Sequence, residues 1–235
     1  MKLQHLVYQY WNRHLMSSAT TNTIRQQKTR LRQSIQDQLV NLSTDTIHGN
    51  SRNVIQQLLT NQLYVHSRSI CCYVSTEYEL QTDELIQHAL LHDKHIYIPC
   101  IHHDTEHNHS VMDMVRLYGM DDYMNLQTNK WGIREPSITY TCTNTSTTIQ
   151  RANALDDNEC NVLIVPGVAF NIHTNERLGH GRGYYDRYIT RINTIRNKNK
   201  LLPVTTIGLS LACQCVDDIP TDIHDVKLNH ILHPK

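Results

Sequence analysis

The sequence predicts an α/β protein, a three-layer sandwich whose central sheet is mostly parallel and is covered by helices on both faces. Apolar runs of strand length alternate along the chain with segments whose apolar residues recur at helical spacing. Between residues 161 and 192 a strand, a glycine-rich loop and a helix follow one another directly. With 235 residues, the chain is long enough for one such domain and short for two.

The first half of the chain predicts helices over 23–42, 52–64 and 83–92, and strands over 69–74, 95–99 and 111–117. Thr82 is the expected N-cap of the third helix, whose first turn holds Asp83 and Glu84, where the helix dipole favours acids. His102, His103, His107 and His109 alternate with polar residues. We interpret this segment as a solvated loop and not as a metal site.

The second half begins with a polar stretch, 137–158, which predicts a loop or insertion of low complexity. Strands are expected over 161–165, 205–209 and 226–232, and a helix begins after residue 183. In parallel sheets, ligands bind at the carboxyl ends of the strands. The segments 75–79 and 166–186, and the residues after Leu209, all fall on that edge, so we expect the binding site there.

The composition argues against several classes of function. Lys plus Arg and Asp plus Glu number 22 each, so no net charge attracts nucleic acid or an anionic membrane. The longest apolar runs have the length of strands and are too short to cross a bilayer. Seven cysteines without a C-x-x-C pair suit a reducing compartment better than a disulfide framework. We expect a monomer that acts on a small molecule, in the cytoplasm or in mitochondria.

Residues 1–22 differ from the rest of the chain. No acidic residue precedes Asp37, and several apolar residues could form one face of a short helix. This pattern is typical of a mitochondrial transit peptide, and an untidy N-terminal extension explains it equally well. We therefore divide the chain into this extension and a single catalytic domain over 23–235.

The segment 177–186, RLGHGRGYYD, is the strongest candidate for a binding site. Glycines let the backbone approach an anion, and the N-terminus of the following helix adds positive potential. Arg177 and Arg182 add full charges whose planar forks match phosphate oxygens. Asp186, in the first turn of the helix, is placed to hold a metal ion shared with those phosphates. The glycines alone would also fit a tight turn; the charged neighbours favour a ligand.

Together with PGVAF at 166–170, this segment resembles the 5-formyltetrahydrofolate cyclo-ligases, also called methenyltetrahydrofolate synthetases. Other segments fit the family pattern in order: KTRLR at 28–32, YVS at 73–75, ELQT at 79–82, MDMVR at 112–116, KWGI at 130–133, and Pro220 with His224 and Asp225. The resemblance thus extends over most of the chain. It implies a Rossmann-like domain of the type found in sugar-phosphate isomerases and CoA transferases.

The resemblance implies that ATP and Mg²⁺ drive ring closure of 5-formyltetrahydrofolate, which could carry a polyglutamate tail. The products are 5,10-methenyltetrahydrofolate, ADP and phosphate. Phosphorylation of the formyl oxygen makes it a leaving group, and N10 then attacks the formyl carbon. In such a phosphoryl transfer, the protein mainly positions the reactants and neutralises charge.

The resemblance also implies which residues form the site. Catalysis would depend on Arg177 and Arg182. ATP would be bound by Lys28, Arg32, Arg177, Leu178, Gly179, His180, Gly181, Arg182, Gly183, Tyr184 and Tyr185. The folate would be bound by Val74, Glu79, Trp131, His180, Gly181, Arg182, Gly183 and Tyr184, and Mg²⁺ by Asp186 and Asp225. Glu79 suits a pterin because a carboxylate can accept two N–H bonds from an aminopyrimidine edge.

Two features depart from the family pattern. Asn171 stands where the family usually has Asp, and the segment 172–176 is one residue longer and lacks a glycine. We expect these changes to loosen the loop before Arg177 and to lower activity. They leave open a non-catalytic folate- or nucleotide-binding homologue, and the architecture alone leaves open an enzyme of the sugar-phosphate isomerase type.

Overall fold

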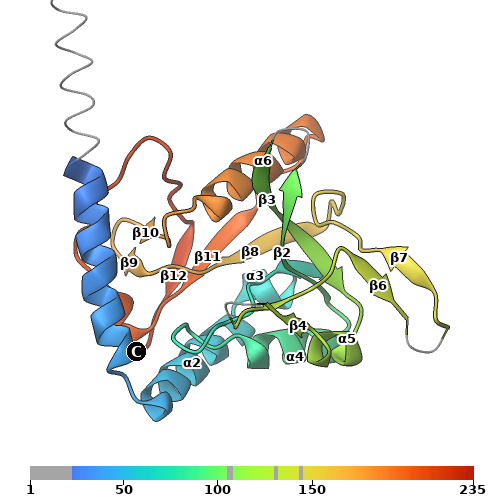
Figure 1. Ribbon diagram of the computed structural model, residues 1–235, viewed down its shortest axis with the longest axis horizontal. Coiled ribbons are helices and arrows are strands. Elements are labelled where there is room, and N and C mark those ends of the chain that lie inside the picture. Colours follow the sequence, from blue (N-terminus) through green and yellow to red (C-terminus); the bar gives the residue numbers. More distant parts are fainter. Residues whose placement is uncertain (1–22, 105–107, 130–131, 143–144) are drawn as a thin grey trace, which may run out of the picture.

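The structure is a computed structural model that describes residues 23–104, 108–129, 132–142 and 145–235. The expected extension over 1–22 lies outside the described residues. A six-stranded sheet with the order β12-β11-β8-β1-β2-β3 forms the middle of the molecule (Figure 1). All neighbouring strands are parallel except β2 and β3, which confirms the predicted fold class.

The strands of this sheet are β1 (Ser69–Cys71), β2 (His95–Asp104), β3 (His109–Leu117), β8 (Cys160–Val165), β11 (Thr205–Leu209) and β12 (His230–Leu232). The helices are an N-terminal helix over 23–40, α2 (Thr44–Leu59), α3 (Gln62–Val65), α4 (Asp83–Leu91), α5 (Met120–Met124), α6 (Tyr184–Lys198) and the 3-10 helix η1 (Ala212–Gln214). Three small hairpins pair β4 (Gln127–Thr128) with β5 (Arg134–Glu135), β6 (Thr139–Thr141) with β7 (Thr148–Gln150), and β9 (Ala169–Asn171) with β10 (Glu176–Leu178).

Both faces of the sheet are buried, as the continuous apolar strands require. Successive side chains of a strand point to opposite faces. In β8, Val162 and Ile164 therefore join the apolar cluster formed with α2 and α4, and Leu163 and Val165 join the cluster formed with α6. Figure 1 shows α6 on one side of the sheet and α2 to α4 on the other. In the described part of the chain, no helix is long and apolar enough to cross a membrane.

Two helix predictions were wrong in detail. The helix expected over 52–64 begins at Thr44, because the Ser43 hydroxyl caps it by accepting a bond from the Thr46 N–H at 3.2 Å, and a turn divides it into α2 and α3. Thr82 precedes α4 as expected, but its side chain does not cap the helix. Its hydroxyl donates to the Tyr73 carbonyl at 2.8 Å and so ties the start of α4 to the end of β1.

The histidine-rich segment is mostly strand, and the prediction of a loop was wrong for its described part. His102 and His103 belong to β2 and His109 to β3, whose long antiparallel pairing extends to Asp104. Among the described residues, no group of three or more His, Cys, Asp or Glu side chains could hold a metal ion. Position 107 lies outside the described residues.

The polar stretch 137–158 also contains more structure than a loop. It forms the β6–β7 hairpin, and Arg151 follows directly. The Arg151 guanidinium makes two bonds of 2.6 Å to the buried carboxylate of Asp122, before β4. This ion pair fastens the hairpin to the domain, and the Thr- and Asn-rich composition gave no sign of it.

Candidate active site

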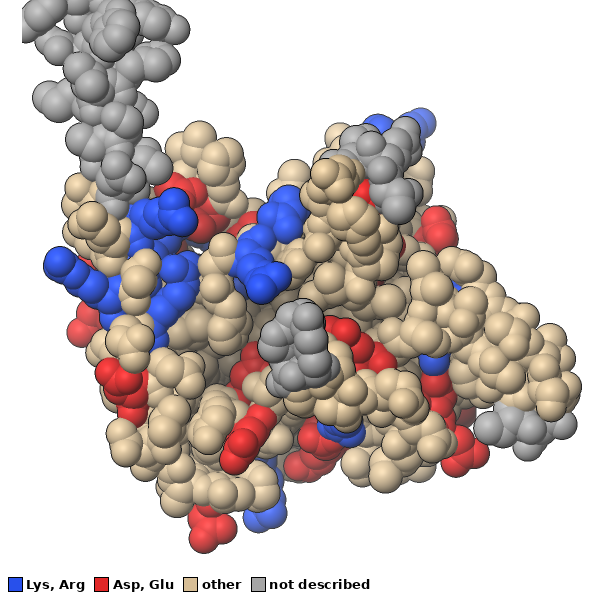
Figure 2. Space-filling model, in the orientation of Figure 1, with Lys and Arg blue, Asp and Glu red and all other residues tan. Residues whose placement is uncertain are grey.

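A cleft of about 1760 Å³ opens at the carboxyl edge of the sheet, and Lys and Arg side chains border the hollow beside the N-terminal helix (Figure 2). It is lined by every expected site residue that the structure describes: Lys28, Arg32, Val74, Glu79, Arg177, Leu178, Gly179, His180, Gly181, Arg182, Gly183, Tyr184, Tyr185, Asp186 and Asp225. Trp131 lies outside the described residues. Residues from both ends of the chain thus meet at the edge that the sequence indicated.

The segment 177–183, which we call the phosphate loop, has the geometry of an anion site. Gly181 and Gly183 have φ values of 97° and 65°, which favour glycine. None of the backbone N–H groups of residues 179–183 has a protein acceptor in the described part of the chain. The loop leads directly into α6, whose N-terminus adds positive potential. Free donors at a helix N-terminus suit a phosphate group.

Arg32 holds the phosphate loop from the side of the N-terminal helix. Its Nε donates to the Gly179 carbonyl at 2.8 Å. A Cβ added at Gly181 would lie 3.4 Å from the guanidinium carbon of Arg32, so a larger residue would disturb this contact. Burial lowers the pKa of Arg32, which nonetheless stays charged at neutral pH.

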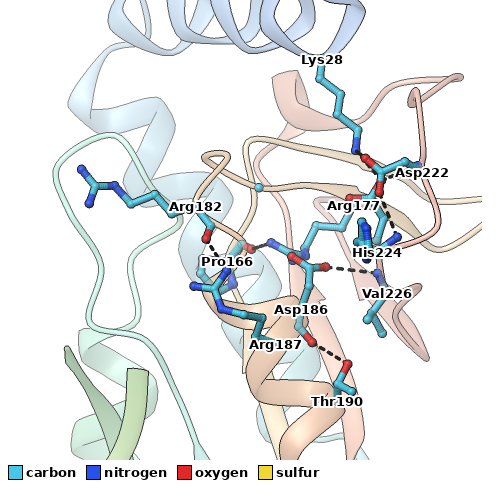
Figure 3. Close-up of polar contacts among 12 residues, drawn as sticks. Lys28, Pro166, Arg177, Arg182, Asp186, Arg187, Thr190, Asp222, His224 and Val226 are labelled. Atoms are coloured by element: carbon cyan, nitrogen blue, oxygen red, sulfur yellow. Dashed lines mark hydrogen bonds and ion pairs between the residues drawn. The ribbon is translucent and has the colours of Figure 1, made fainter. Parts of the chain in front are cut away.

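Arg177 is a deeply buried cation of the site, with a side chain only 4% exposed. Its Nη2 donates to Asp186 Oδ2 at 2.9 Å and its Nη1 to the Pro166 carbonyl at 3.2 Å (Figure 3). The other carboxylate oxygen of Asp186 accepts the Val226 N–H at 3.1 Å. Asp186 therefore joins the phosphate loop to the segment after η1, and both of its oxygens have a protein partner.

Lys28 has two acidic partners on that same segment. Its Nζ lies 2.7 Å from Asp222 Oδ2 and 2.5 Å from Asp225 Oδ2 (Figure 3). Burial acts to lower the pKa of Lys28, but the two carboxylates outweigh it and raise the pKa above its usual value. Sequence reasoning missed Asp222. The only signal in the sequence was the position of Asp222 three residues before Asp225. In the structure, the Asp222 N–H donates to Asp225 Oδ2 at 2.7 Å and closes a turn.

Arg182 and Arg187 are two exposed arginines of the site. In the described part of the chain, the Arg182 side chain has no polar partner, and Figure 3 shows it extending away from the Arg177–Asp186 pair. The Arg187 Nη1 donates to the Arg182 carbonyl at 2.8 Å, and its guanidinium lies 5.2 Å from the Tyr184 ring centre. Sequence reasoning did not single out Arg187.

Glu79 lies opposite the phosphate loop. Its Oε2 accepts the Thr76 N–H and the Thr76 hydroxyl, both at 2.9 Å, and its Oε1 lies 3.7 Å from His180 Nε2. Burial acts to raise the pKa of Glu79, but the contacts with His180 and Thr76 outweigh it and hold the pKa below its usual value. The side chain is thus a half-buried carboxylate that lines the cleft, and His180 connects it to the phosphate loop.

Three of the expected ligand contacts differ in their packing. Leu178 is buried in the apolar core, so only its backbone can reach a nucleotide. Tyr185 packs against both apolar clusters, and burial raises its pKa well above the usual value. Tyr184 lies below the Arg187 guanidinium at the cleft wall. The geometry favours Tyr184 as a ligand contact and Tyr185 as a packing residue.

The departures from the family pattern lie in a turn that hydrogen bonds close. Asn171 Oδ1 accepts the N–H groups of His173 and Thr174 at 2.9 and 3.0 Å, and its amide donates to the Asp217 carbonyl at 2.7 Å. Asn175 adopts a φ of 59°, a left-handed conformation that Asn tolerates better than most residues. The turn between β9 and β10 is therefore closed by asparagine side chains in place of an acid and a glycine.

The two expected metal ligands differ in their suitability for a divalent cation. Both oxygens of Asp186 have protein partners, and its charge is balanced by Arg177. Asp222 and Asp225 share a single ammonium, so one negative charge is left over, and their side chains are 36% and 26% exposed. Mg²⁺ bound with ATP needs only one or two carboxylates. The residues therefore fit a cation at Asp225 better than at Asp186.

Comparison with known proteins places these features in a family. The family model of the 5-formyltetrahydrofolate cyclo-ligases matches residues 24–234. The chain is 31% identical to the 5-formyltetrahydrofolate cyclo-ligase of Haemophilus influenzae over 88% of this chain and 97% of the relative, and 28% identical to that of Mus musculus over 93% and 97%. The fold is similar to the NMR structure of Aquifex aeolicus 5,10-methenyltetrahydrofolate synthetase, with a TM-score of 0.62 and 23% identity over 87% of this chain and 88% of that one.

Proposed function

The chain belongs to the 5-formyltetrahydrofolate cyclo-ligase family, and we propose that it uses ATP to convert 5-formyltetrahydrofolate into 5,10-methenyltetrahydrofolate, ADP and phosphate. One observation carries the proposal: a single cleft joins an open, cationic phosphate loop to the half-buried carboxylate of Glu79. These are the partners required by a triphosphate and a pterin. Closure of the β9–β10 turn by Asn171 supports this function over that of a non-catalytic homologue.

In this proposal, ATP binds between the N-terminal helix and the phosphate loop. The N–H groups of residues 179–183 and the side chains of Lys28, Arg32 and Arg182 neutralise the phosphates. Arg177 supports the loop from behind, since its side chain is buried and held by Asp186. Arg182 is exposed, and its guanidinium stays in contact with the phosphoryl group while that group is transferred. Electrostatic stabilisation of this kind supplies most of the catalysis in phosphoryl transfer.

The folate binds on the opposite wall. Glu79 accepts the N–H groups of the pterin edge, with Val74 beside it, and the formyl oxygen points to the phosphate loop. The formyl oxygen attacks the γ-phosphorus and the bond to ADP breaks. N10 then attacks the formyl carbon and loses its proton, and the C–O bond breaks to release phosphate. His180 lies between the two binding areas and can contact either substrate.

Mg²⁺ accompanies ATP and would be held by phosphate oxygens and Asp225, with Asp222 beside it. When bound, it would supply charge neutralisation at the phosphates. Asp186 would act mainly through Arg177. The protein would act as a monomer in the cytoplasm or in mitochondria; gel filtration and localisation of a tagged full-length chain would test these two points.

The decisive experiment incubates the purified protein with 5-formyltetrahydrofolate and MgATP and follows the near-ultraviolet absorbance of the methenyl product. We expect turnover that requires ATP, and a loss of about 100-fold in kcat for Arg182→Ala, as for removal of one oxyanion-stabilising donor. The matched control, Lys198→Ala, removes an exposed cation on α6 outside the cleft and should be fully active. Folate binding without product formation would refute the proposal.

A further inference from the structure

Part of the cleft lining comes from α6 and the β2–β3 hairpin, and we call this part the side arm; it comprises Ile101, His103, Met112, Arg187 and Thr190. Lys28 and Arg32, in contrast, belong to the N-terminal helix, which lies away from the β2–β3 hairpin (Figure 1). The proposed positions of ATP and the pterin leave this arm without an occupant.

Arg187 is the cation of the side arm that has no acidic partner in the described part of the chain. Two other arginines at this end of the cleft are paired, Arg191 with Asp113 and Arg134 with Asp83. The carbonyl of Arg182 is the one acceptor of the Arg187 guanidinium among the described residues, at 2.8 Å. The remaining N–H donors of its planar fork are free to bind a carboxylate in bidentate fashion.

The guanidinium of Arg187 is also held in place before any ligand binds. It lies over the Tyr184 ring, and the Arg182 carbonyl fixes one nitrogen. A Cβ added at Gly183 would lie 3.0 Å from Arg187 Nη1, so the absence of a side chain there leaves room for this position. A preorganised cation loses less conformational freedom on binding.

The walls of the side arm are apolar next to this charge. Met112 is buried, and Ile101 is 41% exposed at the cleft surface. A flat ring can pack on such side chains, and a carboxylate carried by the ring would then reach a cation at the rim. The ligand that fits is an aromatic ring with an anionic extension.

We propose that the side arm binds the p-aminobenzoylglutamate part of the folate substrate and that Arg187 pairs with its glutamate carboxylates. This inference rests on the proposed function. The tail leaves the pterin next to N5, so it begins beside the formyl group and therefore beside the phosphate loop. Arg187 follows that loop by only four residues. The pairing makes Arg187 a determinant of substrate specificity and leaves ATP binding to Lys28, Arg32 and the loop.

The test compares two substrates, 5-formyltetrahydrofolate and the primary amide of 5-formyltetrahydropteroate, which keeps N10 and the ring but carries no carboxylate. For the natural chain we expect the KM of the amide to be about five- to tenfold higher, as for loss of one charge-assisted bidentate contact. In Arg187→Ala the two KM values should become equal, with the KM of ATP unchanged. Lys198→Ala should keep the difference.

If Arg187→Ala fails to fold, the two KM values of the natural chain are sufficient to test the inference. Equal KM values for the two substrates in the natural chain, or a raised KM for ATP in Arg187→Ala, would overturn the inference. Arg187→Lys keeps the charge without the fork and should keep only part of the preference. Failure of the proposed function has a different signature, since neither substrate would then give a methenyl product.

Discussion

Asp186→Asn should destabilise the folded protein by about 3 kcal/mol, the lower end of the range for breaking a buried ion pair. The Arg177 side chain is 4% exposed and that of Asp186 is 20% exposed, so the lower end is appropriate. Asparagine keeps an oxygen for the Val226 N–H but removes the charge. Arg177 then remains buried with the Pro166 carbonyl as its other acceptor among the described residues.

Urea unfolding of the ligand-free protein, followed by far-ultraviolet circular dichroism, would measure this loss. For a chain of this size, about 3 kcal/mol corresponds to a fall in Tm of about 6–12 °C. Glu159→Gln is the matched control, because its partner Arg68 is 76% exposed and such pairs contribute about 1 kcal/mol or less. Equal effects of the two substitutions would refute the claim that the Arg177–Asp186 pair is buried. Arg177→Met combined with Asp186→Asn should recover part of the loss.

Three further predictions concern the other parts of the site. Lys28→Met should raise the KM of ATP about tenfold and leave the KM of the folate nearly unchanged, because one phosphate-binding charge is lost; equal changes in both would contradict this role. Gly181→Ala should cost about 1–2 kcal/mol in urea unfolding because its φ of 97° disfavours alanine, and a neutral effect would argue against this backbone. The pKa of Glu79 lies below its usual value of 4.5, despite burial, because of His180 and Thr76. Its carboxylate therefore stabilises the fold above pH 4.5, and this contribution is lost as the pH falls through the folded pKa. The unfolding free energies of the natural chain and Glu79→Gln should converge at low pH; a constant difference would contradict the shift.

Local signals in the sequence were sufficient for the sheet and for the loop that leads into α6. Continuous apolar runs such as 161–165 require burial on both faces, and β8 fulfils this by dividing its side chains between two clusters. The glycines and arginines of 177–183 predicted an anion-binding loop before a helix, and the loop has free donors at the start of α6. The sheet and the order of loop and helix could be predicted because their causes act within a few residues of one another, whereas anion binding by the loop stays a prediction.

Contacts between distant segments were not accessible in the same way. Lys28 was expected to bind ATP, but its two acidic partners, Asp222 and Asp225, follow about 200 residues later. No periodicity or spacing reports such a pairing, because it depends on how the N-terminal helix docks on the segment after η1. Arg187 was overlooked for the opposite reason. Its charge is ordinary on a helix surface, and only the absence of a nearby carboxylate among the described residues marks it as available for a ligand.

The expectation of a looser loop at Asn171 judged a departure from a family pattern by residue name, without the hydrogen bonds that the structure shows there. A carboxylate and a carboxamide both offer an oxygen to backbone N–H groups, and the turn between β9 and β10 needs an acceptor and not a charge. The missing glycine is replaced at Asn175, since asparagine adopts the left-handed conformation at modest cost. The amide of Asn171 adds a bond to the Asp217 carbonyl that a carboxylate could not make. Asn171→Asp introduces the residue that is usual in the family. It would thus place a negative charge against that carbonyl and should weaken this turn.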